Sequence, residues 1–194
     1  DVYKRQGLNG SGKSTILKSI VKQLKSLGGV VYLNGKATSE MKETEIAKSL
    51  SMVMTEHIHP ELMSCRDVVA TGRYPYTGRL GILDKQDWKL VDEAITMVHA
   101  EEVAEQSFTR ISDGQRQRVM LARAICQDTA ILVLDEPTSY LDIRYKLDIL
   151  NSIRKLARER NIAVIMSLHE LDLVQKVSDM VACVDGTTVS HIGP

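Results

Sequence analysis

The chain has 194 residues, 43% of them hydrophobic, which is enough for one sizeable core and suits a single domain. Its 25 basic and 25 acidic residues balance, so no overall field favours nucleic acid or an anionic membrane surface as a partner. Neither a run of 18 apolar residues nor a signal peptide pattern occurs, so we expect a protein that works in the cytoplasm and does not itself cross a membrane.

A glycine-rich segment near the start of the chain fits the phosphate-binding pattern G-x-x-x-x-G-K-[ST]. In this pattern glycines turn the backbone so that its N–H groups face phosphate oxygens, and the following helix directs its positive end at them. The pattern predicts bound ATP or GTP: Lys13 is expected to reach the β- and γ-phosphates, and the Ser14 hydroxyl to coordinate Mg²⁺. The alternative is an ordinary glycine turn before a helix. The expected nucleotide-binding residues are Gly7, Asn9, Gly10, Ser11, Gly12, Lys13, Ser14 and Thr15.

Both ends of the chain suggest a gene fragment. A phosphate-binding loop normally follows a buried strand, yet residues 1–6 contain no apolar run and no initiating Met. This hexapeptide resembles translated sequencing-adapter sequence, and the chain stops at residues 193–194, just after an expected strand. We therefore expect truncation at both ends, with a central strand missing, and the fragment alone could be inactive.

Hydrophobic periodicity and turn residues indicate alternating helices and strands. Three apolar runs in the second half suit strands buried on both faces of a parallel sheet. Asp84 is placed to cap a helix within the helical stretch, and Ile143, Leu147, Leu150 and Ile153 mark one side of a later helix. The expected elements are a helix over 13–27, a strand over 30–33 turned by Asn34-Gly35, a strand over 50–54, a helical stretch over 65–105, and strands over 130–134, 162–168 and 180–184.

Two carboxylates follow the apolar run at 130–134, where ligands sit in open parallel sheets. Asp135 could hold Mg²⁺ through its water shell, since this small hard ion prefers oxygen ligands and keeps several waters. Glu136 would then orient or deprotonate the attacking water. The alternative, two acids that merely end a strand at the surface, is weakened by the presence of Lys13 and Ser14.

The segment Ile111-Ser112-Asp113-Gly114-Gln115 opens a further helix, with Ser112 as a plausible cap. Here the chain resembles the ABC ATPase family, whose signature is usually written LSGGQ, and the resemblance covers practically the whole chain. Residues 139–142 look like its D-loop and His169 like its switch histidine. The resemblance implies an α/β P-loop NTPase, a single domain over 1–194. It would have a mostly parallel sheet core, a small antiparallel β part and a helical subdomain inserted at approximately 60–125.

The resemblance also assigns roles. It implies that Glu136, His169 and Lys13 are catalytic, with His169 at the γ-phosphate, and that Ser112, Gly114 and Gln115 contact ATP bound by the opposite subunit. Two copies would then form a head-to-tail dimer closed by a two-fold axis, which ATP holds together and hydrolysis releases. A lone histidine at a strand end would otherwise be a structural residue.

Two departures from the family pattern stand out. Asp113 replaces the middle glycine of the signature, a substitution shared with importer ATPases for iron chelates and cobalamin, and it brings a carboxylate close to the expected phosphate. Thr55 and Glu56 stand where the family's lid loop has a Gln. Thr55 is the best match for that Gln, and we expect it to be able to offer an oxygen to Mg²⁺ or its water.

The segment Gly72-Arg73-Tyr74-Pro75 resembles a G-R-x-P segment of importers for siderophores, haem and cobalamin, although alone it would be a proline-bearing turn. His57 and His59 form an H-x-H, for which solvated loop residues are the simpler interpretation. Cys65, Cys126 and Cys183 are odd in number and widely spaced, which suggests reduced thiols and neither a disulfide framework nor a zinc site.

The resulting hypothesis is the ATP-binding and hydrolysing subunit of an ABC importer for an iron-siderophore or related metal chelate. It would lie on the inner face of the cell membrane, with two permease subunits and, indirectly, a substrate-binding protein as partners and no direct contact with nucleic acid. The alternatives are a non-transport ABC ATPase acting on nucleic acid or ribosomes, and a nucleotide-independent scaffold. Balanced charge and the lack of a coiled-coil insertion argue against the first, and intact Lys13, Asp135, Glu136 and His169 argue against the second.

Overall fold

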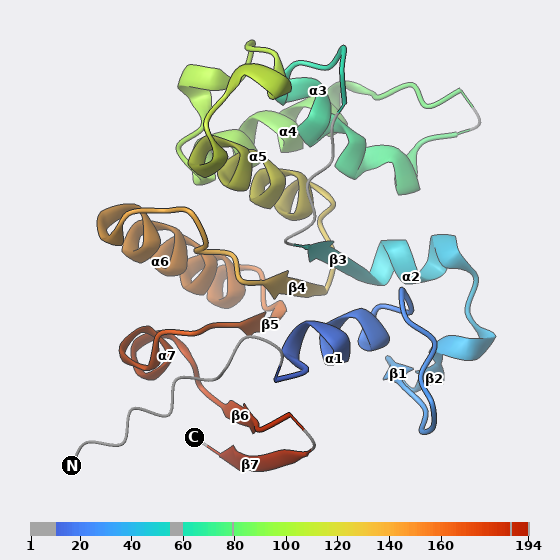
Figure 1. Cartoon of the computed structure of the whole chain (residues 1–194). Helices are drawn as coiled ribbons and strands as arrows, with labels where there is room; N and C mark the ends of the chain where they lie inside the picture. Colours follow the sequence, from blue (N-terminus) through green and yellow to red (C-terminus); the bar gives the residue numbers. More distant parts are fainter. Residues whose placement is uncertain (1–10, 55–59, 79, 187, 194) are drawn as a thin grey trace.

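The computed structural model describes residues 11–54, 60–78, 80–186 and 188–193. Within these ranges helices and strands alternate along the chain (Figure 1). The α-helices are α1 (Lys13–Ile20), α2 (Glu43–Ser49), α3 (Cys65–Ala70), α4 (Lys85–Met97), α5 (Asp113–Cys126), α6 (Ile143–Glu159) and α7 (Leu171–Val177). Short 3-10 helices are η1 (Thr38–Glu40), η2 (Thr71–Tyr76), η3 (Glu101–Val103) and η4 (Phe108–Arg110). The strands are β1 (Tyr32–Leu33), β2 (Lys36–Ala37), β3 (Leu50–Val53), β4 (Ile131–Asp135), β5 (Ala163–Ser167), β6 (Val181–Val184) and β7 (Val189–Gly193).

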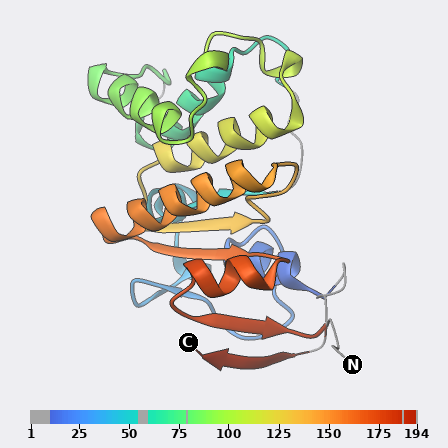
Figure 2. The same cartoon turned by 90° about the vertical axis from the view of Figure 1, so that its left-hand side faces the viewer.

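The central sheet is parallel, in the order β3-β4-β5. Successive side chains of a strand point to opposite sides of a sheet, so alternate residues of β4 show what covers each face. Val133 packs with Leu17 of α1 on one face, whereas Leu132 and Leu134 belong to the larger cluster on the other. Figure 1 shows α6 and α7 on one side of these strands and α1 on the other, and Figure 2 shows β6 and β7 below the strands. The sheet is therefore covered on both faces, as the apolar run of β4 predicts.

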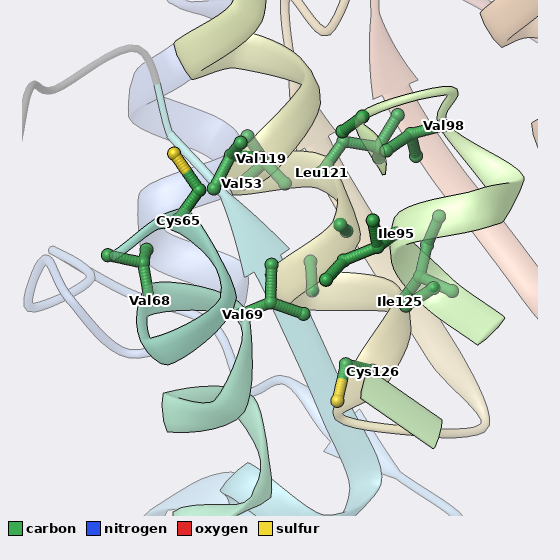
Figure 3. Close-up of a cluster of buried hydrophobic side chains, with 14 of the residues drawn as sticks. Val53, Cys65, Val68, Val69, Ile95, Val98, Val119, Leu121, Ile125 and Cys126 are labelled. Atoms are coloured by element: carbon green, nitrogen blue, oxygen red, sulfur yellow. The ribbon is translucent and has the colours of Figure 1, made fainter. Parts of the chain in front are cut away.

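The larger core joins the helical part to the sheet (Figure 3). This cluster contains Val53 at the end of β3, Cys65 and Val69 of α3, and Val119 and Ile125 of α5. All five side chains are buried. Helix α5 thus packs on α3 and α4 as well as on the sheet, so its N-terminus is held by both parts of the molecule.

Local chemistry explains several element boundaries. Asp84 caps α4 as expected. Its side chain accepts a hydrogen bond from the Asp87 N–H at 2.8 Å, and the Asp87 side chain accepts one from the Asp84 N–H. The turn between β1 and β2 has positive φ at both Asn34 and Gly35, which is the type I′ hairpin that this dipeptide predicts. Helix α1 ends well before the expected residue 27 because Lys22 adopts a φ of 63°.

Three expectations about burial were wrong. β5 is only partly buried, and β6 pairs antiparallel with β7 and lies outside the parallel sheet, as far as the described residues go. In those ranges neither strand has a neighbour on its other side, which explains the exposure. On α6 the buried stripe starts later, at Ile149, and Ile143 is 62% exposed because it occupies the first position after the cap at Asp142.

Candidate nucleotide-binding and hydrolysis site

The second half of the phosphate loop leads directly into α1. Gly12 adopts a φ of 91°, a conformation that L side chains rarely take, although a Cβ there would meet no atom within 4 Å. The ammonium group of Lys13 turns back and donates to Ser11 Oγ at 2.9 Å. No acidic residue lies in the first turn of α1, so the positive end of this helix is free to favour an anion. Gly7, Asn9 and Gly10 lie outside the described residues, while Ser14 and Thr15 form the first turn.

The two predicted carboxylates, Asp135 and Glu136, lie at the carboxyl edge of the sheet and have different surroundings. Asp135 is the last residue of β4 and is fully buried. Its Oδ1 accepts from Ser167 Oγ at 2.6 Å. Glu136 follows with a φ of 50°, and its N–H donates to the same Ser167 Oγ at 2.9 Å. The backbone therefore turns sharply between the two acids, which sends the Glu136 side chain away from the core.

Glu136 and His169, which follow the adjacent strands β4 and β5, lie together in the structure. His169 Nε2 and Glu136 Oε1 form a hydrogen bond, and the second carboxylate oxygen accepts from Ser139 Oγ at 3.1 Å. The side chain of Gln117 in α5 reaches the Glu136 carbonyl oxygen at 3.4 Å. The Glu136 carboxylate is thus held by His169 after β5 and by Ser139 in the segment that resembles a D-loop. The Glu136 backbone is held by α5, the helix that follows the signature.

The signature segment forms the N-terminus of α5. Ser112 Oγ accepts from the Gln115 N–H at 3.3 Å, and Gln115 Oε1 accepts from the Ser112 N–H at 2.9 Å, which makes a capping box. A Cβ on Gly114 would lie 3.3 Å from the carbonyl oxygen of Tyr140 and 3.4 Å from Leu141 Cδ2. Glycine at this position therefore lets the signature and residues 140–141 of the same chain lie side by side.

Asp113, the departure within the signature, is paired with a cation. Arg116 Nη1 donates to Asp113 Oδ1 at 2.6 Å, one turn along the helix. The Arg116 guanidinium also lies over the Phe108 ring, at 5.6 Å from its centroid. The added carboxylate is accordingly offset by a guanidinium that packing holds in place.

The predicted donor residues are of the types that suit Mg²⁺. Asp135 and Ser14 offer oxygen atoms, which this ion prefers, and a magnesium ion that also binds phosphates and waters needs only one or two protein side chains. Among the described residues, no group of three or more His, Cys, Asp or Glu side chains could hold a metal ion, so a cage built wholly from such side chains is absent there. Thr55, the third candidate oxygen donor, lies outside the described residues, as do Glu56, His57 and His59.

Sequence reasoning missed the part played by Gly72 and Arg73. Arg73 is buried and donates to Asp87 Oδ1 at 2.8 Å and to the Cys126 carbonyl oxygen at 3.0 Å. Its guanidinium stacks on the Tyr76 ring, 4.1 Å from the centroid. The segment thus joins the cap of α4 to the C-terminal end of α5. In the sequence Arg73 is followed by Tyr-Pro-Tyr. These aromatic neighbours are the one sequence signal that Arg73 is buried.

The comparisons with known proteins agree with the fold. The family model described as "ABC transporter" matches residues 4–139. Over 187 residues the chain is 43% identical to an uncharacterised ABC transporter ATP-binding protein of Methanocaldococcus jannaschii, covering 96% of this chain and 64% of that protein. It is 37% identical over 186 residues to the iron(3+)-hydroxamate import ATP-binding protein FhuC of Bacillus subtilis, covering 95% of this chain and 69% of that protein.

Among solved structures, a dimeric ATP-binding cassette in a post-hydrolysis state, bound to ADP and phosphate, is similar with a TM-score of 0.81 and 25% identity. The match covers 94% of this chain and 80% of that one. The fold and the site therefore define a P-loop NTPase, and the chain belongs to the ABC transporter family. It spans 64% and 69% of the length of the two relatives. No helix in the described part of the chain is long and apolar enough to span a membrane.

Proposed function

We propose that this chain is the catalytic part of an ABC importer subunit that binds and hydrolyses ATP to drive uptake of an iron-siderophore or related metal chelate. The observation that carries the hydrolytic part is the hydrogen bond between Glu136 and His169 at the carboxyl ends of β4 and β5. This contact supports a role for Glu136 as base, because ligands bind at the carboxyl ends of the strands in parallel α/β sheets. Asp135, which would face the metal, is the residue immediately before this base.

Each side chain then has a distinct task in hydrolysis. Glu136 takes the proton from a water whose oxygen attacks the γ-phosphorus, while the bond to the β-bridging oxygen breaks and ADP leaves. His169 holds Glu136 and the water in line with that bond. Lys13 neutralises charge on the β- and γ-phosphates, and it exchanges Ser11 for phosphate oxygens to do so. Mg²⁺ held by Ser14 and Asp135, with Thr55 as a further candidate, would add positive charge at the phosphates.

The signature acts on a second copy of the chain in this proposal. Ser112 and Gln115 bond to each other through the capping box, which holds the Ser112 side chain at the exposed end of α5. The N-terminus of a 14-residue helix is suited to receive a phosphate. With Gly114 packed on residues 140–141, the signature and the neighbouring loop form one surface for the partner subunit. The dimeric state of the similar cassette with ADP and phosphate supports this arrangement.

The importer assignment rests on the kinship with FhuC, whose name gives iron(3+)-hydroxamate import. Several large apolar side chains are also exposed in the helical part, and they are candidates for contact with another protein. We propose that two membrane permease subunits bind to the helical part, that a substrate-binding protein acts with them, and that the ATPase lies on the cytoplasmic face of the membrane. The exposed side chains are Leu62, Tyr74, Leu80 and Ile82.

Two measurements on the full-length gene product test this function. Purified protein should release phosphate from ATP in the presence of Mg²⁺, and Lys13→Ala should lose binding of a fluorescent ATP analogue together with hydrolysis. Co-expression with the neighbouring permease genes should yield a membrane complex that contains the ATPase. Hydrolysis that is stimulated by RNA or DNA, with no permease association, would contradict the importer assignment and leave the ATPase assignment intact.

A further inference from the structure

A single buried hydroxyl group links the carboxylate of Asp135 to the backbone nitrogen of Glu136. Ser167 is the last residue of β5 and lies opposite Asp135 in the parallel register. It is 6% exposed. Its Oγ lies 2.6 Å from Asp135 Oδ1 and 2.9 Å from the Glu136 nitrogen. One side chain therefore touches both the predicted metal ligand and the backbone of the predicted base.

The direction of the two hydrogen bonds follows from their partners. The Glu136 N–H can only donate, so Ser167 Oγ must accept this bond. The single hydroxyl proton is then directed to Asp135 Oδ1, which accepts this hydrogen bond. Both roles of the hydroxyl are thus used, and its orientation is determined by the two acids and not by the strand that carries it.

The Glu136 backbone needs such a support. A non-glycine residue with a φ of 50° is in a sparsely populated conformation that persists only where its surroundings hold it. Ser167 holds the nitrogen, and the Ser139 N–H donates to the Glu136 carbonyl oxygen at 3.1 Å. Two residues beyond Ser167, His169 holds the carboxylate itself. The end of β5 therefore controls the place of both the backbone and the side chain of Glu136.

We propose that Ser167 is a positioning residue for ATP hydrolysis, which holds Asp135 and Glu136 in one fixed relation through its hydroxyl group. This inference rests on the proposed function and adds a residue to it. Removal of the hydroxyl takes away the hydrogen bond from Ser167 to the Asp135 carboxylate and releases the Glu136 N–H. We expect both acids to shift by a fraction of an ångström, and small displacements of catalytic groups are costly to the rate.

The test compares Ser167→Ala with Ser51→Ala in the full-length protein. Ser51 offers a matched control, because it is a buried serine of the same sheet whose Oγ accepts from Thr129 Oγ1 at 2.9 Å, outside the site. We expect Ser167→Ala to lower kcat about tenfold or more and to raise the Mg²⁺ concentration that supports half-maximal turnover. Ser51→Ala should keep kcat within about twofold of the wild-type value while the two variants lose similar thermal stability.

Two binding readouts separate positioning from general damage. A fluorescent ATP analogue should bind Ser167→Ala as tightly as wild type in EDTA, and the gain in affinity on adding Mg²⁺ should be smaller in the variant. Ser167→Thr, which keeps a hydroxyl group, should restore kcat to within about threefold of wild type. Should Ser167→Ala not fold, Ser167→Cys takes its place, since a thiol is a weak donor, and it should turn over more slowly than Ser167→Thr.

The proposal fails if Ser167→Ala keeps wild-type kcat and Mg²⁺ dependence, if it loses no more activity than Ser51→Ala, or if the Cys and Thr variants turn over equally. An inactive wild-type protein would instead contradict the proposed function. The two failures are therefore distinguishable in one set of assays.

Discussion

Arg116 donates to Asp113 across one turn of α5, with 2.6 Å between Nη1 and Oδ1. The side chain of Asp113 is 59% exposed, whereas that of Arg116 is only 16% exposed and rests on Phe108. The negative charge of Asp113, which replaces a signature glycine, is thus offset by the adjacent Arg116 guanidinium. The substitution is therefore compatible with phosphate binding at the end of this helix.

We predict that Asp113→Gly, which restores the glycine usual in the family, changes ATP turnover by no more than about twofold. Loss of a pair with one exposed partner should cost less than about 1 kcal/mol of folding stability. Phosphate release and a thermal melt measure both effects. A rise in turnover of an order of magnitude would show that Asp113 repels the nucleotide in spite of Arg116.

Arg73 should matter for stability far more than a surface arginine. Its side chain and that of Asp87 are 9% and 13% exposed, so Arg73→Ala leaves a carboxylate unpaired in a largely buried place. We expect a loss of about 3 kcal/mol or more in the free energy of unfolding. Lys36→Ala, which breaks an exposed pair with Glu45, should cost less than about 1 kcal/mol. Chemical denaturation gives both values, and equal losses would contradict the structural role of Arg73.

The ion pair between Arg73 and Asp87 predicts that the stability of the fold depends on pH in the acidic range. Burial by itself would raise the pKa of Asp87, but hydrogen bonds from Arg73 and the Asp84 N–H lower this pKa below its ordinary value of 3.8. A carboxyl group with a lowered pKa stabilises the fold above pH 3.8, and this contribution is lost as the pH falls through the folded-state value. Asp87→Asn should therefore reduce the loss of stability between pH 5 and acid extremes, relative to wild type. Parallel curves for the two proteins would refute this contribution.

Gly72 and Gly78 offer a pair of matched alanine substitutions. A Cβ on Gly72 would clash with the carbonyl oxygen of Arg123, which is helix backbone and cannot move aside easily, whereas a Cβ on Gly78 would meet no atom within 4 Å. We predict that Gly72→Ala costs roughly 1–3 kcal/mol and that Gly78→Ala stays within about 0.5 kcal/mol of wild type. Thermal melts of both variants decide the matter, and a neutral Gly72→Ala would show that η2 is loosely packed on α5.

The three cysteines should differ sharply in reactivity. Burial raises the pKa of the Cys65 thiol to about 11 and that of Cys126 to about 12, while Cys183 is exposed. At pH 8 a thiol of pKa 12 is ionised in roughly one molecule in ten thousand. Iodoacetamide should therefore label Cys183 in the native protein, and all three residues only after denaturation. Rapid native labelling of Cys126 would show that α5 opens at its C-terminal end.

Motif spacing predicted the candidate catalytic residues, and tertiary contacts revealed the residues that hold them in place. Lys13, Glu136 and His169 could be found because each lies in a pattern that their chemistry requires. Ser167 could not, since its role depends on the register that sets it opposite Asp135. Its signal in the sequence is weak: it is the one hydroxyl-bearing residue in the apolar run 162–168. The partial exposure of β5 was also unpredictable, because an apolar run does not reveal how many strands flank it.

The central claim is that Glu136 activates water in a site completed by a second copy of the chain. Glu136→Gln in the full-length protein is the most direct test, because the amide keeps the shape of the side chain and cannot take a proton. With Mg²⁺ and ATP, size-exclusion chromatography with light scattering should show a stable dimer that retains ATP, and phosphate release should be abolished. The double variant with Lys13→Ala should remain monomeric. A Glu136→Gln protein that hydrolyses ATP at the wild-type rate, or that stays monomeric with ATP bound, would contradict the claim.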